Sequence, residues 1–179
     1  MGYSKFHEFI WNNIKETALS KRERDALFGK EGTLLSNSVK NLRITDNDIA
    51  GGEIAEIFLY GIMRTHYGAL PVVPKIFYKQ NAHDYAKGAD SVHIVIEESG
   101  AFSLWLGEAK FYNNLTNDRL GTIIESVFET ISTDKIRKEN AIILNVSDLD
   151  EFEISQETKD NIKHLLSSDT FVLRNLDLY

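Results

Sequence analysis

A short turn near the middle of the chain constrains the fold more than any other feature. Two β-prone segments, residues 90–97 and 101–111, are separated by Glu98-Ser99-Gly100. A three-residue loop with glycine in the left-handed conformation places Glu97 opposite Ala101, so the two residue numbers in every cross-strand pair sum to 198. A two-residue loop would shift this sum to 199 and move every side chain to the other face. The turn therefore predicts a hairpin in one of two registers.

The first register brings chemically active side chains together at one end of the hairpin. Asp90 then faces Glu108, and opposed residues have Cβ atoms about 4.5–5.5 Å apart, so the two carboxylates repel unless a cation or a proton lies between them. Lys110 points to the same face as Glu108, roughly 7 Å along the strand. Two carboxylates and an ammonium group suit phosphodiester hydrolysis by Mg²⁺, a hard cation that takes oxygen ligands. The alternatives are that Asp90 is a turn residue and that Glu-x-Lys occurs by chance.

A buried helix precedes the hairpin and offers further carboxylates. Its apolar stripe begins after Asp48 and ends at Gly68, a typical helix stop. Glu53, Glu56 and Tyr60 stand at i, i+3 and i+7, so they share one edge of this helix. These side chains are either further candidates for the same site or simply the solvated side of the helix.

The remaining periodicities predict the order of the elements. We expect helices over residues 4–19, 48–68, 120–133 and 156–166, a basic loop over 21–41, and strands over 72–78, 90–97, 101–111, 141–146 and 171–174. The main part then has the order αβββαβ, which indicates the α/β class. We divide the chain into an N-terminal helix with a basic loop, residues 1–44, and one larger domain, residues 45–179.

Composition excludes several classes of protein. The 179 residues include no cysteine, which excludes a disulfide scaffold, a thiol nucleophile and a zinc site built on cysteine. The longest apolar run is far shorter than the roughly 18 residues of a membrane helix, and the N-terminus has no signal pattern. We therefore expect a soluble, cytoplasmic protein with no membrane partner.

The charge is acidic in sum but uneven along the chain. The net charge of -7 argues at first against a nucleic-acid binder, because phosphate-binding surfaces are usually basic. Residues 1–44, however, carry eight basic and five acidic residues, a net +3, whereas residues 139–179 carry three and nine, a net -6. These segments are either solvated faces without special meaning or two surfaces with different partners.

The candidate residues resemble a known superfamily. Asp90, Gly107-Glu108-Ala109-Lys110 and Gly52-Glu53-Ile54-Ala55-Glu56 together resemble the PD-(D/E)XK nucleases, whose common core has this αβββαβ order. More narrowly, residues 88–94 and 104–112 are similar to the HamA C-terminal domain, the nuclease component of the Hachiman anti-phage defence system. The resemblance covers about residues 48–146 and implies a restriction-endonuclease-like core, in which helices flank a mixed central sheet.

The resemblance also implies roles for individual residues. Asp90 and Glu108 would be the metal-binding pair, Lys110 the catalytic lysine and Glu56 the helix glutamate, with Glu53 as the lesser metal ligand. It implies Mg²⁺ as the cofactor, with Mn²⁺ able to substitute, DNA as the substrate and a helicase as the partner protein. The alternative is a catalytically silent module that keeps the nuclease fold for binding or regulation. One departure is that no proline precedes Asp90.

Other polar residues are weaker candidates. Tyr60 and Ser126 are candidates to face the site from the two helices. Lys75, Lys79 and Lys87 surround the hairpin in sequence and are candidates to contact phosphates, although surface lysines require no such explanation.

Overall fold

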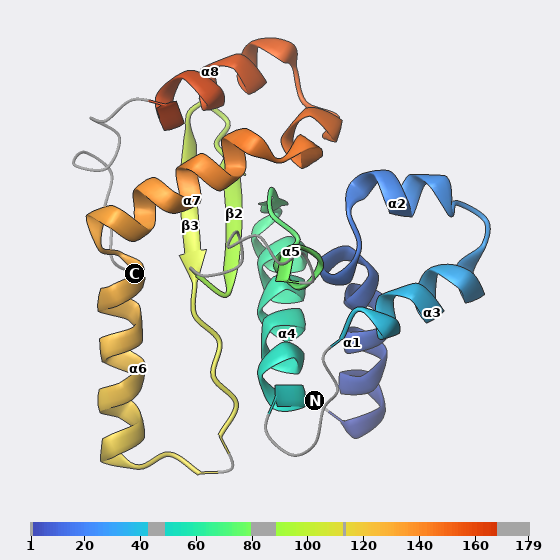
Figure 1. Ribbon diagram of the computed structural model, residues 1–179, viewed down its shortest axis with the longest axis vertical. Coiled ribbons are helices and arrows are strands. Elements are labelled where there is room, and N and C mark those ends of the chain that lie inside the picture. The colour runs from blue at the N-terminus through green and yellow to red at the C-terminus, as the bar shows by residue number, and fades with distance from the viewer. Residues whose placement is uncertain (1, 43–48, 80–88, 113, 168–179) are drawn as a thin grey trace.

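The computed structural model describes residues 2–42, 49–79, 89–112 and 114–167 (Figure 1). Within these residues, helices and a small antiparallel sheet form a mixed α/β arrangement. The elements are α1 (Tyr3–Ala18), α2 (Lys21–Ala26), α3 (Glu31–Lys40), α4 (Ile49–Tyr67), β1 (Leu70–Pro71), α5 (Lys75–Lys79), β2 (Ser91–Ile96), β3 (Phe102–Gly107), α6 (Asn117–Thr130), α7 (Thr133–Asn145), the 3₁₀ helix η1 (Ser147–Glu151) and α8 (Gln156–Ser167).

The segment predicted as a basic loop is helical. α2 and α3 make up most of residues 21–41, so the loop prediction was wrong. A capping box begins α2: the Ser20 hydroxyl accepts a hydrogen bond from the Glu23 backbone N–H, and the Glu23 side chain accepts one from the Ser20 N–H. α3 then packs against α1 and buries Leu34.

Helices α1 and α4 were predicted close to their observed bounds and lie side by side (Figure 1). Gly68 follows α4 with a φ of +60°, which confirms the predicted stop. Ile14 of α1, Ile57 of α4 and Ile76 of α5 belong to one buried cluster. The predicted boundary after residue 44 stays a prediction, although α1 shares this cluster with the larger domain.

The hairpin has the predicted register. All six β2–β3 pairs, from Ser91 opposite Gly107 to Ile96 opposite Phe102, have residue numbers that sum to 198. The Gly100 N–H donates to the Glu97 carbonyl over 3.0 Å, and Gly100 has a φ of +82°. The three-residue loop is therefore confirmed, and the register that separates the carboxylates is excluded.

The strand predicted over residues 72–78 was wrong. The sheet begins earlier, with the short β1, and residues 75–79 form α5. Pro74 explains the change, because proline has no N–H for a strand ladder and readily precedes a helix. Within the described residues, β1, β2 and β3 pair in that order and every pairing is antiparallel, so the mixed central sheet is not observed there.

The strand predicted over residues 141–146 was also wrong, because this run belongs almost entirely to α7. A short apolar run has the same appearance in a buried strand and in a buried helix. The burial pattern over residues 136–143 distinguishes a helix from a strand. Ile136, Glu139 and Ile143 are buried while Arg137 and Ala141 are exposed, which is the periodicity of a helix. The order αβββαβ is therefore not reproduced in the described residues. The strand predicted over 171–174 lies outside them.

The main core lies between the hairpin and the C-terminal helices. Val92 and Ile94 pack with Ile142 and Ile143 of α7 and with Ile162 of α8. The alternate β2 residues face the other way, where α4 contacts the strand. The hairpin is thus covered by α7 and α8 on one side and by α4 on the other (Figure 1).

Helix α6 departs from this packing. Its apolar residues include Ile124 and Phe128, which are 54% and 64% exposed. Its more enclosed face carries Ser126 and Thr130 instead. Across the described residues, each helix is too short or too polar to cross a membrane.

Candidate active site

Asp90 and Glu108 lie at the same end of the hairpin. Ser91 and Gly107 form the last β2–β3 pair, so Asp90 and Glu108 occupy the next position on the two chains. Asp90 Oδ2 accepts a hydrogen bond of 3.0 Å from the Ala109 N–H, which fixes this carboxylate against the chain that follows β3. The prediction that the turn brings the two acidic residues together is confirmed by this geometry.

The Lys110 ammonium group lies between the two carboxylates. Lys110 Nζ is 3.0 Å from Glu108 Oε2 and 3.4 Å from Asp90 Oδ2. The repulsion expected between two opposed carboxylates is thus offset by a cation from the same strand end. The Lys110 side chain remains 31% exposed, so the cluster opens to solvent on its side.

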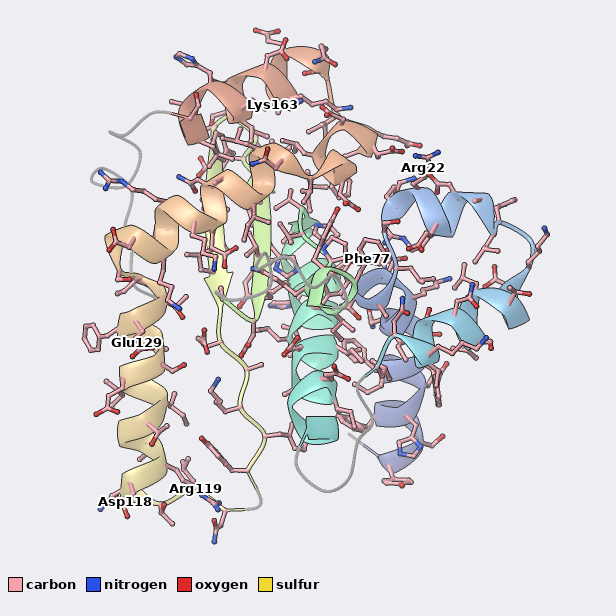
Figure 2. All side chains as sticks on the ribbon, viewed as in Figure 1. Arg22, Phe77, Asp118, Arg119, Glu129 and Lys163 are labelled. Atoms are coloured by element: carbon pink, nitrogen blue, oxygen red, sulfur yellow. The ribbon has the colours of Figure 1, made fainter. Side chains whose placement is uncertain are left out.

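Helix α6 holds Glu108 from the other side. The Ser126 hydroxyl donates to Glu108 Oε2 over 2.8 Å, and the Thr130 hydroxyl donates to Glu108 Oε1 over 2.5 Å. α6 runs beside the segment that follows β3 (Figure 1), and Figure 2 labels Asp118 and Glu129 near the two ends of this helix. Ser126 was a sequence candidate. Thr130 was missed, although its i+4 spacing from Ser126 would have placed it on the same face.

These contacts set the protonation of the cluster. Burial acts to raise the pKa of Glu108, but the hydrogen bonds from Thr130, Ser126 and Lys110 and the charge of Lys110 outweigh it and lower this pKa below its ordinary value. Burial likewise acts to lower the pKa of Lys110, whereas its hydrogen bond to Glu108 and the charges of Asp90 and Glu108 raise it overall. Glu108 is therefore a carboxylate and Lys110 an ammonium group at neutral pH.

The helix carboxylates are buried rather than solvated. Glu53 and Glu56 of α4 are only 4% and 7% exposed, which excludes the interpretation that they form the wet side of the helix. Glu56 lines a cavity of about 10 Å³ together with Asp90, so the structure brings these two carboxylates to one place. Among the described residues, Glu53 is not part of that lining.

Hydroxyl groups and one lysine also line this cavity. Tyr60 Oη and Ser91 Oγ are buried there without a hydrogen bond inside the described part of the chain, and burial raises the pKa of Tyr60. Lys75 also lines the cavity, but it is buried and paired with Glu139, so its predicted role as a surface phosphate contact was wrong. Glu139 was missed, because no local pattern links it to Lys75. The side chains of Lys79 and Lys87 lie outside the described residues.

The donor set suits a hard divalent cation. Asp90, Glu108 and Glu56 offer carboxylate oxygens, the ligands that Mg²⁺ prefers, and Lys110 already places one positive charge between the first two. No three acidic or histidine side chains within the described ranges are grouped so as to hold a metal ion as they stand. A cation shared by Asp90 and Glu108 would therefore compete with the Lys110 ammonium.

Comparison with known proteins places the chain in a family. The family model described as HamA matches residues 2–175, which extends well beyond the region of the sequence resemblance on both sides. A search of curated proteins and a search of solved structures found no match. The chain therefore belongs to the HamA family.

Proposed function

We propose that this chain is a metal-dependent nuclease that hydrolyses DNA phosphodiester bonds as the effector of the Hachiman anti-phage defence system. The observation that carries the proposal is the cluster of Asp90, Glu108 and Lys110, joined by contacts of 3.0 and 3.4 Å at the open end of the hairpin. Membership of the HamA family supports the defence context. The resemblance to PD-(D/E)XK nucleases supplies the type of reaction.

The proposed cofactor is Mg²⁺, with Mn²⁺ able to replace it. Asp90 and Glu108 would hold the ion together with Glu56, and Glu53 is the lesser candidate ligand. When bound, the ion would polarise the phosphate and lower the pKa of a coordinated water molecule. Glu108 suits this task because its pKa is lowered, which keeps it ionised and ready to bind a cation.

Lys110 has the proposed catalytic role. Its ammonium group hydrogen-bonds to Glu108 and lies near Asp90, so it is held where substrate and the two carboxylates would meet. From there it can orient the attacking water molecule or stabilise negative charge on the phosphate. Ser126 and Thr130 position Glu108 and need not touch the substrate.

A helicase is the proposed partner, and the cytoplasm the proposed location. The chain carries a net charge of -7, so a partner that delivers DNA would compensate for a small basic surface. This part of the proposal rests on the resemblance to the Hachiman nuclease.

The test is a cleavage assay with matched variants. Plasmid and linear DNA are incubated with wild type, Glu108→Gln and Lys110→Met in Mg²⁺, Mn²⁺ or EDTA. We expect EDTA and each substitution to lower the cleavage rate by about 100-fold or more. Glu97→Gln is the control, because Glu97 is an exposed acid at the opposite end of the same hairpin. A wild type that never cuts, even with the candidate helicase and ATP, would contradict the proposal.

One observation favours the second candidate function, a catalytically silent module with a nuclease fold. Lys110 already offsets one of the two negative charges of Asp90 and Glu108, so the cluster has a counter-ion without any metal ion. Titration with Mn²⁺ separates the two functions. A silent module would bind no Mn²⁺ at this cluster. A nuclease would bind Mn²⁺ there, and its Asp90→Asn variant would not.

A further inference from the structure

A buried ion pair lies next to the chain that leads into Asp90. Lys75 Nζ of α5 lies 2.7 and 2.8 Å from the two carboxylate oxygens of Glu139 in α7. Their side chains are only 3% and 0% exposed. Desolvation makes such a pair an ineffective way to stabilise a fold, since apolar residues of similar size often serve as well or better. The pair is therefore a reason to look for a second role.

Glu139 has a third contact that leads to the proposed site. Glu139 Oε1 also accepts a hydrogen bond of 2.9 Å from the backbone N–H of Ala89. Ala89 is buried and immediately precedes Asp90. Glu139 therefore anchors the backbone on one side of Asp90, while the Ala109 N–H holds the Asp90 carboxylate on the other.

Lys75 links the same pair to the helix carboxylate. Lys75, Glu56 and Asp90 all line the cavity of about 10 Å³, which is close to the space that one water molecule needs. Glu139 restrains the Lys75 ammonium group with two short contacts. One carboxylate on α7 thus fixes both the chain that leads into Asp90 and a cation that borders Glu56.

We propose that Glu139 is a positioning residue for Asp90: it accepts the Ala89 N–H and so sets where the Asp90 carboxylate lies relative to Glu108 and Glu56. The inference rests on the proposed function, because it assigns Glu139 to the support of that metal site. It extends the site to α7, a helix that the sequence resemblance does not connect to catalysis. Lys75 is the counter-ion that allows a carboxylate to be buried at this position.

Two double variants isolate the positioning contact. Lys75→Met/Glu139→Leu removes both charges and the acceptor for Ala89, whereas Lys75→Met/Glu139→Gln removes both charges but keeps an amide oxygen that can accept from Ala89. The two proteins differ at one side chain of similar size, and both lack the charges of Lys75 and Glu139, so any other effect of removing Lys75 is common to both. Any difference between them therefore reports on the hydrogen bond to Ala89.

The first measurement is amide hydrogen exchange without metal. The Ala109 N–H donates to Asp90 Oδ2, so its protection reports where Asp90 lies. We expect the Ala109 amide to exchange at least about 10-fold faster in the leucine variant than in the glutamine variant, while the amides of the β2–β3 ladder exchange equally in both. Global destabilisation would accelerate all of these amides together.

The second measurement is Mn²⁺ affinity by calorimetry. Loss of a residue that supports metal ligands typically weakens metal binding about 10- to 100-fold, and we expect this loss in the leucine variant. The comparison is made with the glutamine variant rather than with wild type, because both double variants lack Lys75. If the leucine variant does not fold, Glu139→Asp replaces it, because the shorter side chain withdraws the acceptor from Ala89 but keeps the charge.

The outcomes separate this inference from the proposed function. Equal Ala109 protection in the two double variants would overturn the positioning role even if wild type binds Mn²⁺ and cuts DNA. A wild type that binds no Mn²⁺ would overturn the proposed function, and the exchange comparison would still decide whether Glu139 positions Asp90.

Discussion

Glu108 owes its ionised state to two hydroxyl groups of α6 and to Lys110. Burial alone would favour the protonated acid, and the donated hydrogen bonds reverse that effect. Because the pKa of Glu108 is lowered in the folded state, its contribution to stability is present above the unfolded pKa of about 4.5 and is lost as the pH falls through the lower folded value. Acid should therefore loosen α6 from the hairpin.

Thr130→Val tests this dependence, because valine keeps the shape of threonine but cannot donate to Glu108. We expect the pKa of Glu108 to move up toward its ordinary value, and the free energy of unfolding at pH 7 to fall by about 1–3 kcal/mol. Carboxyl-carbon NMR measures the pKa, and urea unfolding measures the stability. Thr122→Val, on an exposed part of the same helix, is the control. An unchanged Glu108 titration would show that the hydroxyl contact is unimportant.

The site residues that the sequence could predict are those that depend on local geometry. Asp90, Glu108 and Lys110 follow from one turn, since side chains alternate along a strand and the loop length sets the register; the sequence left two registers open, and the structure has the one that sums to 198. Glu139 and Thr130 reach the cluster through helix packing over 50 and 22 residues of sequence. No periodicity encodes such contacts, so they could be found only in the structure.

At the scale of elements, the close approach of α1 and α4 depends on a single glycine. A Cβ atom at Gly61 would lie 2.5 Å from two ring atoms of Phe9 and 2.7 Å from Asn13 Nδ2. At Gly52, in the same helix, no atom of the described residues lies within 4 Å of the equivalent position. The same substitution therefore has opposite expected effects at two sites of one helix.

We expect Gly61→Ala to lower the free energy of unfolding by about 1–2 kcal/mol, because overpacking outweighs the gain in helix propensity. Gly52→Ala should raise it by up to about 1 kcal/mol, because only the propensity changes. Thermal unfolding of the two variants beside wild type provides the comparison. Equal changes in the free energy of unfolding for the two variants would mean that α1 and α4 pack less closely than the structure shows.

The elements that were predicted wrongly lacked a clear local signal for the structure that they form. Residues 141–146 form an apolar run that suits a buried strand, and only its polar neighbours reveal the helical period of α7. Residues 21–26 are rich in charge and have no apolar stripe, so only the cap formed by Ser20 marks α2 as a helix. Helices and strands were predicted well where a stop signal such as Gly68 or Gly100 accompanied the periodicity.

At the scale of the whole molecule, stability should depend on one buried histidine. His93 is 1% exposed and packs against the Tyr60 ring, with centroids 5.3 Å apart. Burial lowers its pKa to about 4 from 6.5. Since the unfolded chain then binds a proton at a higher pH than the native protein, stability is complete above pH 6.5 and is lost progressively toward pH 4.

We expect the free energy of unfolding to fall by about 2–3 kcal/mol between pH 6.5 and 4.5, before Glu108 begins to contribute. Urea unfolding across this range measures the loss. His93→Leu should flatten the pH dependence, whereas His7→Gln should leave it unchanged because His7 is exposed. A dependence that survives in His93→Leu would assign it to other groups.

The charge of the whole chain sets an expectation for DNA binding. The N-terminal segment carries the basic excess, yet three of its cations are already paired with acidic side chains of α1, α2 and α3. These ion pairs are Lys15–Glu31, Lys21–Asp25 and Arg24–Glu16. These pairs offset three of the eight basic residues of the segment, and the net charge of -7 opposes close approach to a DNA backbone.

We expect the isolated chain to bind a short DNA duplex with a Kd of about 10 µM or weaker at physiological salt, since few phosphate contacts are available. Raising the salt should abolish this binding, and Lys110→Met should change it little because one ammonium group is a small part of the surface. Fluorescence anisotropy over a salt series measures the affinity. Tight binding that resists salt would contradict the affinity expected from this distribution of charge. It would also remove the physical reason for a partner that delivers the DNA.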